Sequence, residues 1–210
     1  MAQASERDSA HSAAIEIDSV SFRIREAGSG PPLVIFGDGP QADALMNGLA
    51  ARNRALVIGV TGDGGSGARK LAAAAAGALA RIKLETFSMI GISHGAELAL
   101  ALAVFAPNQI DKLILLSPPP LGTLDEGVRS GFGRIAAPTL VMVGTNDRSG
   151  AAETMRTLRE KVPACHVLLI YGAGESIVSD RADSCLTPIG EFLERGIEFV
   201  VCHESQVLRR

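Results

Sequence analysis

The chain has 210 residues, of which 47% are hydrophobic and 20% charged, and its formal net charge is −3. This length suits one domain with a well-buried core, and the composition is globular rather than disordered. The sequence contains no block of lysine and arginine residues, so nucleic-acid binding has no electrostatic support. With one tyrosine and no tryptophan, the core must be mainly aliphatic.

The two ends of the chain differ in character from its middle. Residues 1–13 are polar and lack the apolar stretch of a secretory signal, so we expect a mobile tail there. We predict a single domain over 14–196 and a C-terminal extension over 197–210. The three cysteines are scattered without metal-ligand spacing, which favours free thiols in a reducing compartment and no metal site. No stretch reaches the roughly 18 apolar residues that span a membrane, so we predict a cytoplasmic protein without a membrane partner.

Short apolar runs alternate with helical patterns along the chain. Strands are expected near 14–18 and 20–25, over 33–36, and in the runs RALVIGV, FSMIGI, DKLILL, PTLVMVG and HVLLIY. Helices are expected in QADALMNGLAARN, over 68–83, in AELALALAVFAP and AAETMRTLREK, and over 181–195 with Pro188 inside. This alternation predicts an α/β fold, with a mostly parallel central sheet, helices on both faces and an antiparallel pair at one edge. Functional groups are then expected in the loops at the carboxyl ends of the strands.

The segment MIGISHGAEL contains a G-x-S-x-G motif with Ser93 at its centre. An apolar strand precedes the serine and an apolar helix follows it, as a nucleophile elbow requires. Gly91, Gly95 and Ala96 are the small residues that such a sharp turn needs, because the strand and the helix nearly touch there. The alternative is a structural turn with an incidental serine.

Five segments in this order make the chain resemble the α/β-hydrolase family. GPPLVIFGDG resembles the strand and oxyanion loop, ALVIGVTGDGGSG the next strand and loop, and SMIGISHGAELALALA the elbow. IAAPTLVMVGTND resembles the strand before the triad acid, and HVLLIYGAGES resembles the strand and loop that present the triad histidine. The resemblance implies Ser93 as nucleophile and Asp147 as acid. It also implies an oxyanion hole formed by the backbone N–H groups of His94 and of Asp38 or Gly39.

The chain departs from the family pattern in three places. Glu175 stands where the triad histidine is expected, the oxyanion loop reads Phe36-Gly37 instead of His-Gly, and the cap region over 121–136 is short, which predicts a lidless form. A serine hydroxyl needs a base to remove its proton, and a carboxylate is a much weaker base than imidazole. A buried Glu175 close to Asp147 would be a stronger base or would hydrogen-bond that acid.

Four histidines are the other possible bases. The side chain of His94 is expected to point away from the serine's base site, and His166 falls inside a strand. His203 lies in the C-terminal extension and His11 in the N-terminal tail. The base is therefore Glu175 or a histidine delivered from elsewhere in the chain.

Three functions remain open at this stage. The first is a serine hydrolase of esterase or thioesterase type, with an atypical base and no cofactor, that acts on a small-molecule ester or acyl substrate. The second is a non-catalytic binding or scaffold protein of the same fold. The third is dinucleotide binding through Gly62–Gly67, which matches G-x-G-x-x-G after a strand but lacks a well-placed acid roughly 20 residues on.

Overall fold

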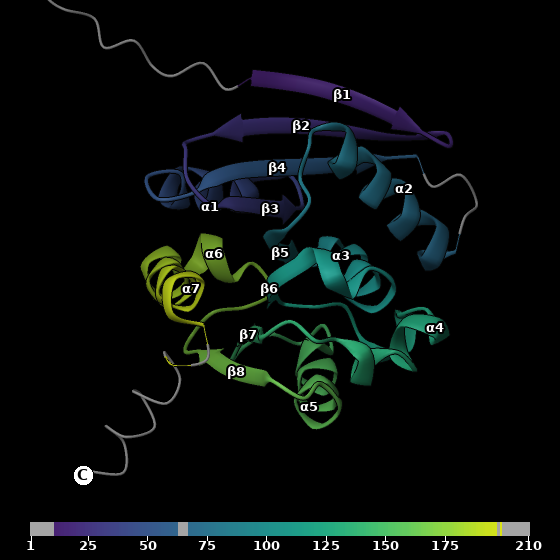
Figure 1. Ribbon diagram of the computed structural model, residues 1–210. Coiled ribbons are helices and arrows are strands. Elements are labelled where there is room, and N and C mark those ends of the chain that lie inside the picture. Colours follow the sequence, from purple (N-terminus) through teal and green to yellow (C-terminus); the bar gives the residue numbers. More distant parts are fainter. Residues whose placement is uncertain (1–10, 63–66, 197, 199–210) are drawn as a thin grey trace, which may run out of the picture.

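The computed structural model describes residues 11–62, 67–196 and 198, and it contains one central sheet with helices on both faces (Figure 1). The strands are β1 (His11–Ile17), β2 (Val20–Ala27), β3 (Pro32–Phe36), β4 (Arg54–Thr61), β5 (Phe87–Ile92), β6 (Ile110–Leu116), β7 (Thr139–Gly144) and β8 (Cys165–Ile170). The α-helices are α1 (Gly39–Leu49), α2 (Ala68–Arg81), α3 (Gly95–Phe105), α4 (Glu126–Arg129), α5 (Ala151–Lys161), α6 (Ile177–Asp180) and α7 (Ala182–Arg195). Single 3-10 turns form η1 (Pro107–Gln109), η2 (Leu121–Thr123) and η3 (Phe132–Arg134).

The sheet has the strand order β1-β2-β4-β3-β5-β6-β7-β8. Strands β1, β2 and β4 pair in antiparallel fashion, whereas every pairing from β4 through β3 to β8 is parallel. The prediction of a mostly parallel sheet with an antiparallel pair at one edge is therefore confirmed. The central strands carry nearly continuous buried aliphatic side chains because helices cover both of their faces.

Two hydrophobic clusters hold the helices against the sheet. One cluster joins the sheet to α2, α3 and α5, and the other joins it to α1, α6 and α7, so the two groups of helices lie on opposite faces (Figure 1). Helix α3 has eight buried residues from Ala96 to Val104, so it is covered on nearly all sides, as its uniformly apolar sequence predicts.

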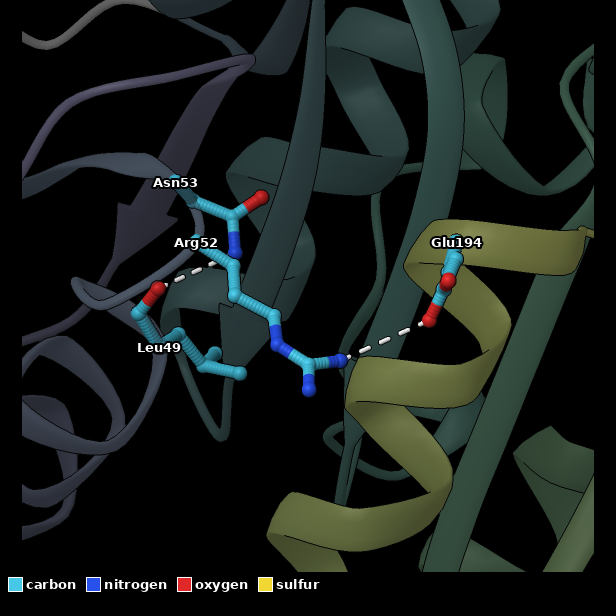
Figure 2. Close-up of polar contacts among 4 residues, drawn as sticks. All are labelled: Leu49, Arg52, Asn53 and Glu194. Atoms are coloured by element: carbon cyan, nitrogen blue, oxygen red, sulfur yellow. Dashed lines mark hydrogen bonds and ion pairs between the residues drawn. The ribbon is translucent and has the colours of Figure 1, made fainter.

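Several polar contacts lie at the amino-terminal edge of the parallel strands. The side-chain amide of Asn53 donates to the carbonyl oxygen of Leu49 over 3.0 Å, and Arg52 reaches Glu194 of α7 over 3.5 Å (Figure 2). The pair of Arg52 and Glu194 is 81% and 66% exposed, so it contributes little to stability. Arg54 donates two hydrogen bonds to Glu26, which raise the pKa of the guanidinium.

The ends of the predicted domain differ slightly from expectation. Strand β1 begins at His11, so residues 11–13 belong to the sheet rather than to the expected tail. Helix α7 contains Pro188 as predicted, and the cap region over 121–136 holds only η2, α4 and η3. Apart from residue 198, the C-terminal extension lies outside the described residues.

The cysteines Cys165 and Cys185 are free thiols, and we expect both to resist alkylation in the folded protein. Burial raises the pKa of Cys165 to about 12, against the opposing effect of Arg159. Burial and the nearby Asp180 raise the pKa of Cys185 to about 11. At pH 8 both groups are therefore protonated, and the thiolate that reacts with iodoacetamide is scarce. Peptide mass spectrometry should find both unmodified in native protein and modified in urea; equal labelling of Cys185 in both states would contradict this expectation.

Candidate active site

The loops that follow β3, β5, β6, β7 and β8 meet at one edge of the sheet, because these strands are parallel and adjacent. Ser93 follows β5, Asp147 follows β7 and Glu175 follows β8. One strand, β6, separates the strand of the serine from the strand of Asp147. Since neighbouring strands lie roughly 4.8 Å apart, the serine and acid strands are roughly 10 Å apart. A third group is needed to carry a proton across that separation.

Ser93 lies in a sharp turn between β5 and α3. Its φ is +48°, a left-handed conformation that costs a non-glycine residue about 1–3 kcal/mol. The N–H of Ser93 donates to the carbonyl oxygen of Leu116 at 2.9 Å, and its own carbonyl oxygen accepts from Ala96 at 3.0 Å. These bonds hold the strained residue in place. The expected strand, turn and helix are all present.

Close packing leaves no room for a side chain at the two glycines of the motif. A Cβ atom on Gly91 would lie 2.5 Å from the Cα of Ala96 and 2.8 Å from the Cβ of Ala99. A Cβ atom on Gly95 would lie only 2.1 Å from the carbonyl oxygen of Phe36. The first glycine therefore lets α3 approach β5, and the second lets the loop after β3 press against the serine turn.

The oxyanion candidates lie on these two touching segments. The N–H of Gly37 donates to the carbonyl oxygen of Ile58 at 3.3 Å, so it is already used. In the part of the chain that the structure describes, the N–H groups of Asp38 and His94 have no such acceptor. Asp38 and Gly39 are exposed, and Gly39 has φ +70° at the start of α1. The backbone around the turn thus has free donors on both of its sides.

A cavity of about 310 Å³ opens beside the turn, between the ends of β3 and β4 and the helices α2 and α3. Asp38, His94, Gly95 and Glu97 are among its lining residues, and Ser93 is not. The pKa of Glu97 is raised chiefly by burial and further by Asp125, while His94 lowers it. His94 thus lies within electrostatic reach of Glu97, in a cavity that the serine itself does not line.

Asp147 follows β7, where the family resemblance places the acid. One carboxylate oxygen, Oδ1, accepts from the backbone N–H of Ser149 at 2.8 Å and from its hydroxyl at 2.6 Å. The other oxygen, Oδ2, is buried and has no hydrogen-bond partner among the described residues. Asp147 therefore both stabilises a turn and keeps one acceptor open.

The loop after β8 is fastened to the loop of Asp147. The N–H of Asn146 donates to the carbonyl oxygen of Ala173, and the N–H of Gly172 donates to the hydroxyl of Thr145, both at 2.9 Å. Backbone groups and the Thr145 hydroxyl make this connection, and Glu175 itself is exposed. Its carboxyl group has no hydrogen bond or ion pair within the described part of the chain. Neither possibility considered for a buried Glu175, a stronger base or a hydrogen bond to Asp147, is found in the described part of the chain, where Glu175 is exposed.

Histidines do not fill the base position among the described residues. His166 pairs with Leu140 near the amino end of β8, and His11 pairs with Glu26 in β1, at the far side of the sheet. His203 lies outside the described residues. His94 is therefore the one imidazole of the described chain at this edge.

Ser117 is a polar residue of this edge that the sequence analysis does not identify. It follows β6, between the serine and acid strands, and it has φ +43°. Its hydroxyl is buried without a hydrogen-bond partner in the described chain, although its N–H donates to Met142 at 2.9 Å. The signal in the sequence that could have identified Ser117 is its position directly after an apolar strand.

Other predicted sites receive less support. Gly62 has φ +82° and Gly67 precedes α2, but residues 63–66 of the dinucleotide-like motif lie outside the described residues. Among the described residues, no three histidine, cysteine or acidic side chains are grouped as metal ligands. None of the described helices is both long and apolar enough to cross a membrane.

No family model and no curated protein matches the sequence. Comparison with solved structures, in contrast, agrees with the architecture described above. Among solved structures, a membrane phospholipase A described as a bacterial virulence factor has a TM-score of 0.75 and 16% identity, covering 90% of this chain and 87% of that one. The naproxen esterase of Bacillus subtilis has a TM-score of 0.74 and 13% identity, covering 88% and 92%.

A third similar structure is an alpha/beta hydrolase from the metagenome of Mar Chica lagoon sediments. Its TM-score is 0.72 at 16% identity, covering 83% of this chain and 95% of that one. Such similarity at low identity establishes the fold, and it agrees with the observed strand order and parallel pairings. The chain therefore has the α/β-hydrolase fold.

Proposed function

We propose that this protein is a serine hydrolase of esterase or thioesterase type in which Ser93 is a nucleophile served by a weak base. The observation that carries the proposal is the strained turn of Ser93, which close packing at Gly91 and Gly95 enforces. Backbone strain of this kind persists only where the surrounding structure imposes it, and it is concentrated at functional sites. Free N–H groups on both sides of the turn support the same assignment.

The proposed reaction proceeds through an acyl-enzyme. The Oγ atom of Ser93 attacks the acyl carbon of a small ester or thioester, and the N–H groups of His94 and Asp38 stabilise the oxyanion that forms. The intermediate then expels the alcohol or thiol, which takes up the serine's proton, and water later releases the acid. Glu175 is the proposed base, and because it is an exposed carboxylate, both steps are slow compared with a histidine-assisted reaction.

Labelling with a fluorophosphonate tests this nucleophile directly. We expect slow covalent labelling at Ser93, because the oxyanion hole alone retains roughly 10³-fold to 10⁴-fold catalysis without a complete triad. Ser93→Ala should abolish the label, whereas Ser88→Ala, at the other end of the same strand, should keep it. Mass spectrometry of the intact protein and of its peptides gives both the extent and the position of labelling.

A non-catalytic binding protein of the same fold is the second candidate. The exposure of Glu175 and the lack of a second imidazole at this edge of the described chain favour it. In that case wild-type protein stays unlabelled at long times and high probe concentrations. Labelling that Ser93→Ala abolishes would reject the binding-protein alternative.

A further inference from the structure

Two arginine side chains contact one aromatic ring on the surface between α2, α3 and η3. The guanidinium carbon of Arg69 lies 4.5 Å from the centroid of the Phe105 ring, and that of Arg134 lies 5.9 Å from the same centroid. Lys70 lines the same hollow, which has a volume of about 420 Å³. Arg69, Lys70 and Arg134 thus line one hollow beside this ring.

In the described part of the chain these cations have no carboxylate partner, unlike two arginines elsewhere in the protein. Arg54 pairs with Glu26, and Arg25 pairs with Asp43. Over residues 11–62 and 67–196, no ion pair joins Arg69, Lys70 or Arg134 to an acidic side chain. Like charges held close to one another repel, and an anion placed between them would relieve that repulsion.

Among the described residues that line the hollow, Asp125 is the one acidic residue. Its Oδ1 atom already accepts from the backbone N–H of Gly127 at 2.8 Å and from that of Val128 at 3.3 Å, where it caps α4. This carboxylate is thus committed to a helix end. The described lining contains three basic residues and one acidic residue, so its net charge is positive.

Small residues keep the hollow open above the ring. A Cβ atom on Gly127 would lie 3.6 Å from the Cζ atom of Phe105, so a larger side chain there would cover the aromatic edge. Gly67 and Ala68 also line the hollow. The hydroxyl of Ser130 donates to Gly127 at 3.3 Å and adds a polar atom to the rim.

We propose that this hollow, formed by Arg69, Lys70, Phe105 and Arg134, binds the phosphate group of a small phosphorylated molecule. Stacking on Phe105 restrains both guanidinium groups, so less conformational freedom is lost when they bind. A phosphate has enough oxygen atoms to accept from two arginine forks and from the lysine ammonium together, whereas a carboxylate has only two. The hollow therefore favours phosphate over carboxylate ligands.

The phosphate hollow lies next to the cavity beside Ser93, because Ala68 lines both. Its binding chemistry uses none of the groups assigned to the hydrolase reaction. The proposal thus stands apart from the function of Ser93, and Ser93→Ala should bind phosphate as the wild type does. A failure of one proposal leaves the other unaffected.

Calorimetric titration of the full chain with pyrophosphate tests the proposal. We expect saturable binding that weakens about threefold to fivefold in Arg69→Gln and in Arg134→Gln, since each removes one exposed charge-assisted contact. Arg156→Gln removes an exposed arginine of α5 that does not line the hollow, and it should leave the affinity unchanged. Unfolding temperatures without ligand check that each variant is folded.

A charge-neutralising variant and a competitor complete the experiment. Asp125→Asn should tighten pyrophosphate binding, because it removes the opposing charge while keeping an oxygen that can cap α4. Acetate should compete poorly. Co-sedimentation with phosphatidylcholine vesicles, with and without phosphatidic acid, shows whether a lipid phosphate is also accepted. No pyrophosphate binding, equal affinity in Arg134→Gln, or weaker binding in Asp125→Asn would overturn the proposal.

Discussion

Replacing Glu175 by histidine is expected to raise the turnover of an activated ester at Ser93 by at least about 100-fold, the usual lower limit for a positioned general base. The imidazole would supply a base with a reference pKa near 6.5 in place of a carboxylate. Its other ring nitrogen would find an acceptor in the buried Oδ2 atom of Asp147, which has no partner within the described chain. Hydrolysis of p-nitrophenyl acetate gives the measurement.

The geometry around position 175 favours this gain. Hydrogen bonds from Asn146 to Ala173 and from Gly172 to Thr145, both at 2.9 Å, hold the loop after β8 against the loop of Asp147. A Cβ atom on Gly144 would lie 2.2 Å from the carbonyl oxygen of Ala173, so the two loops are in direct backbone contact. Residue 175 is two positions from Ala173 and on the surface, where an imidazole is tolerated.

Matched variants separate a new base from a mere loss of charge. Glu175→Gln removes the carboxylate without adding a base and should show no gain, and Ser93→Ala combined with Glu175→His should be inactive. The activity of Glu175→His should also rise with pH through an inflection near 6.5, as its imidazole loses a proton and becomes a base. A folded Glu175→His variant with wild-type turnover would contradict the assignment of Asp147 and position 175 to one site.

Most of the fold follows from the sequence because its signals are local. The strand runs such as LVIF and TLVMVG are continuously apolar, since helices cover the parallel strands on both faces, and this pattern predicts a buried parallel sheet. The first strand begins earlier than the sequence predicts. Residues 11–13 pair with β2 through backbone hydrogen bonds, which a polar sequence can form as well as an apolar one.

The site was predictable in position and less so in detail. Ser93, Asp147 and Glu175 follow the strands expected of them, because strand ends are local features of the sequence. The exposure of Glu175 was not predictable, since it depends on how two loops from distant parts of the chain pack together. The buried hydroxyl of Ser117 was not predictable for the same reason, because its place in the site depends on the strand order that puts β6 between β5 and β7.

Gly95→Ala is expected to lower the free energy of unfolding by about 3 kcal/mol or more, at the upper end of the cost of overpacking. The added Cβ would lie 2.1 Å from the carbonyl oxygen and 2.6 Å from the carbonyl carbon of Phe36. Both are backbone atoms, which no rotamer change can move aside. Either α3 or the loop after β3 must shift. Urea unfolding followed by circular dichroism measures the loss.

Gly190→Ala is the matched control for this substitution. Gly190 lies inside α7, and a Cβ there would meet nothing within 4 Å. Alanine has the higher helix propensity, so this variant should gain about 0.5–1 kcal/mol. The two substitutions make the same chemical change, so the opposite signs of their effects on the free energy of unfolding follow from the surroundings alone. If Gly95→Ala kept wild-type stability and fluorophosphonate labelling, the loop after β3 would not press against the serine turn, and the oxyanion role of Asp38 would fail with it.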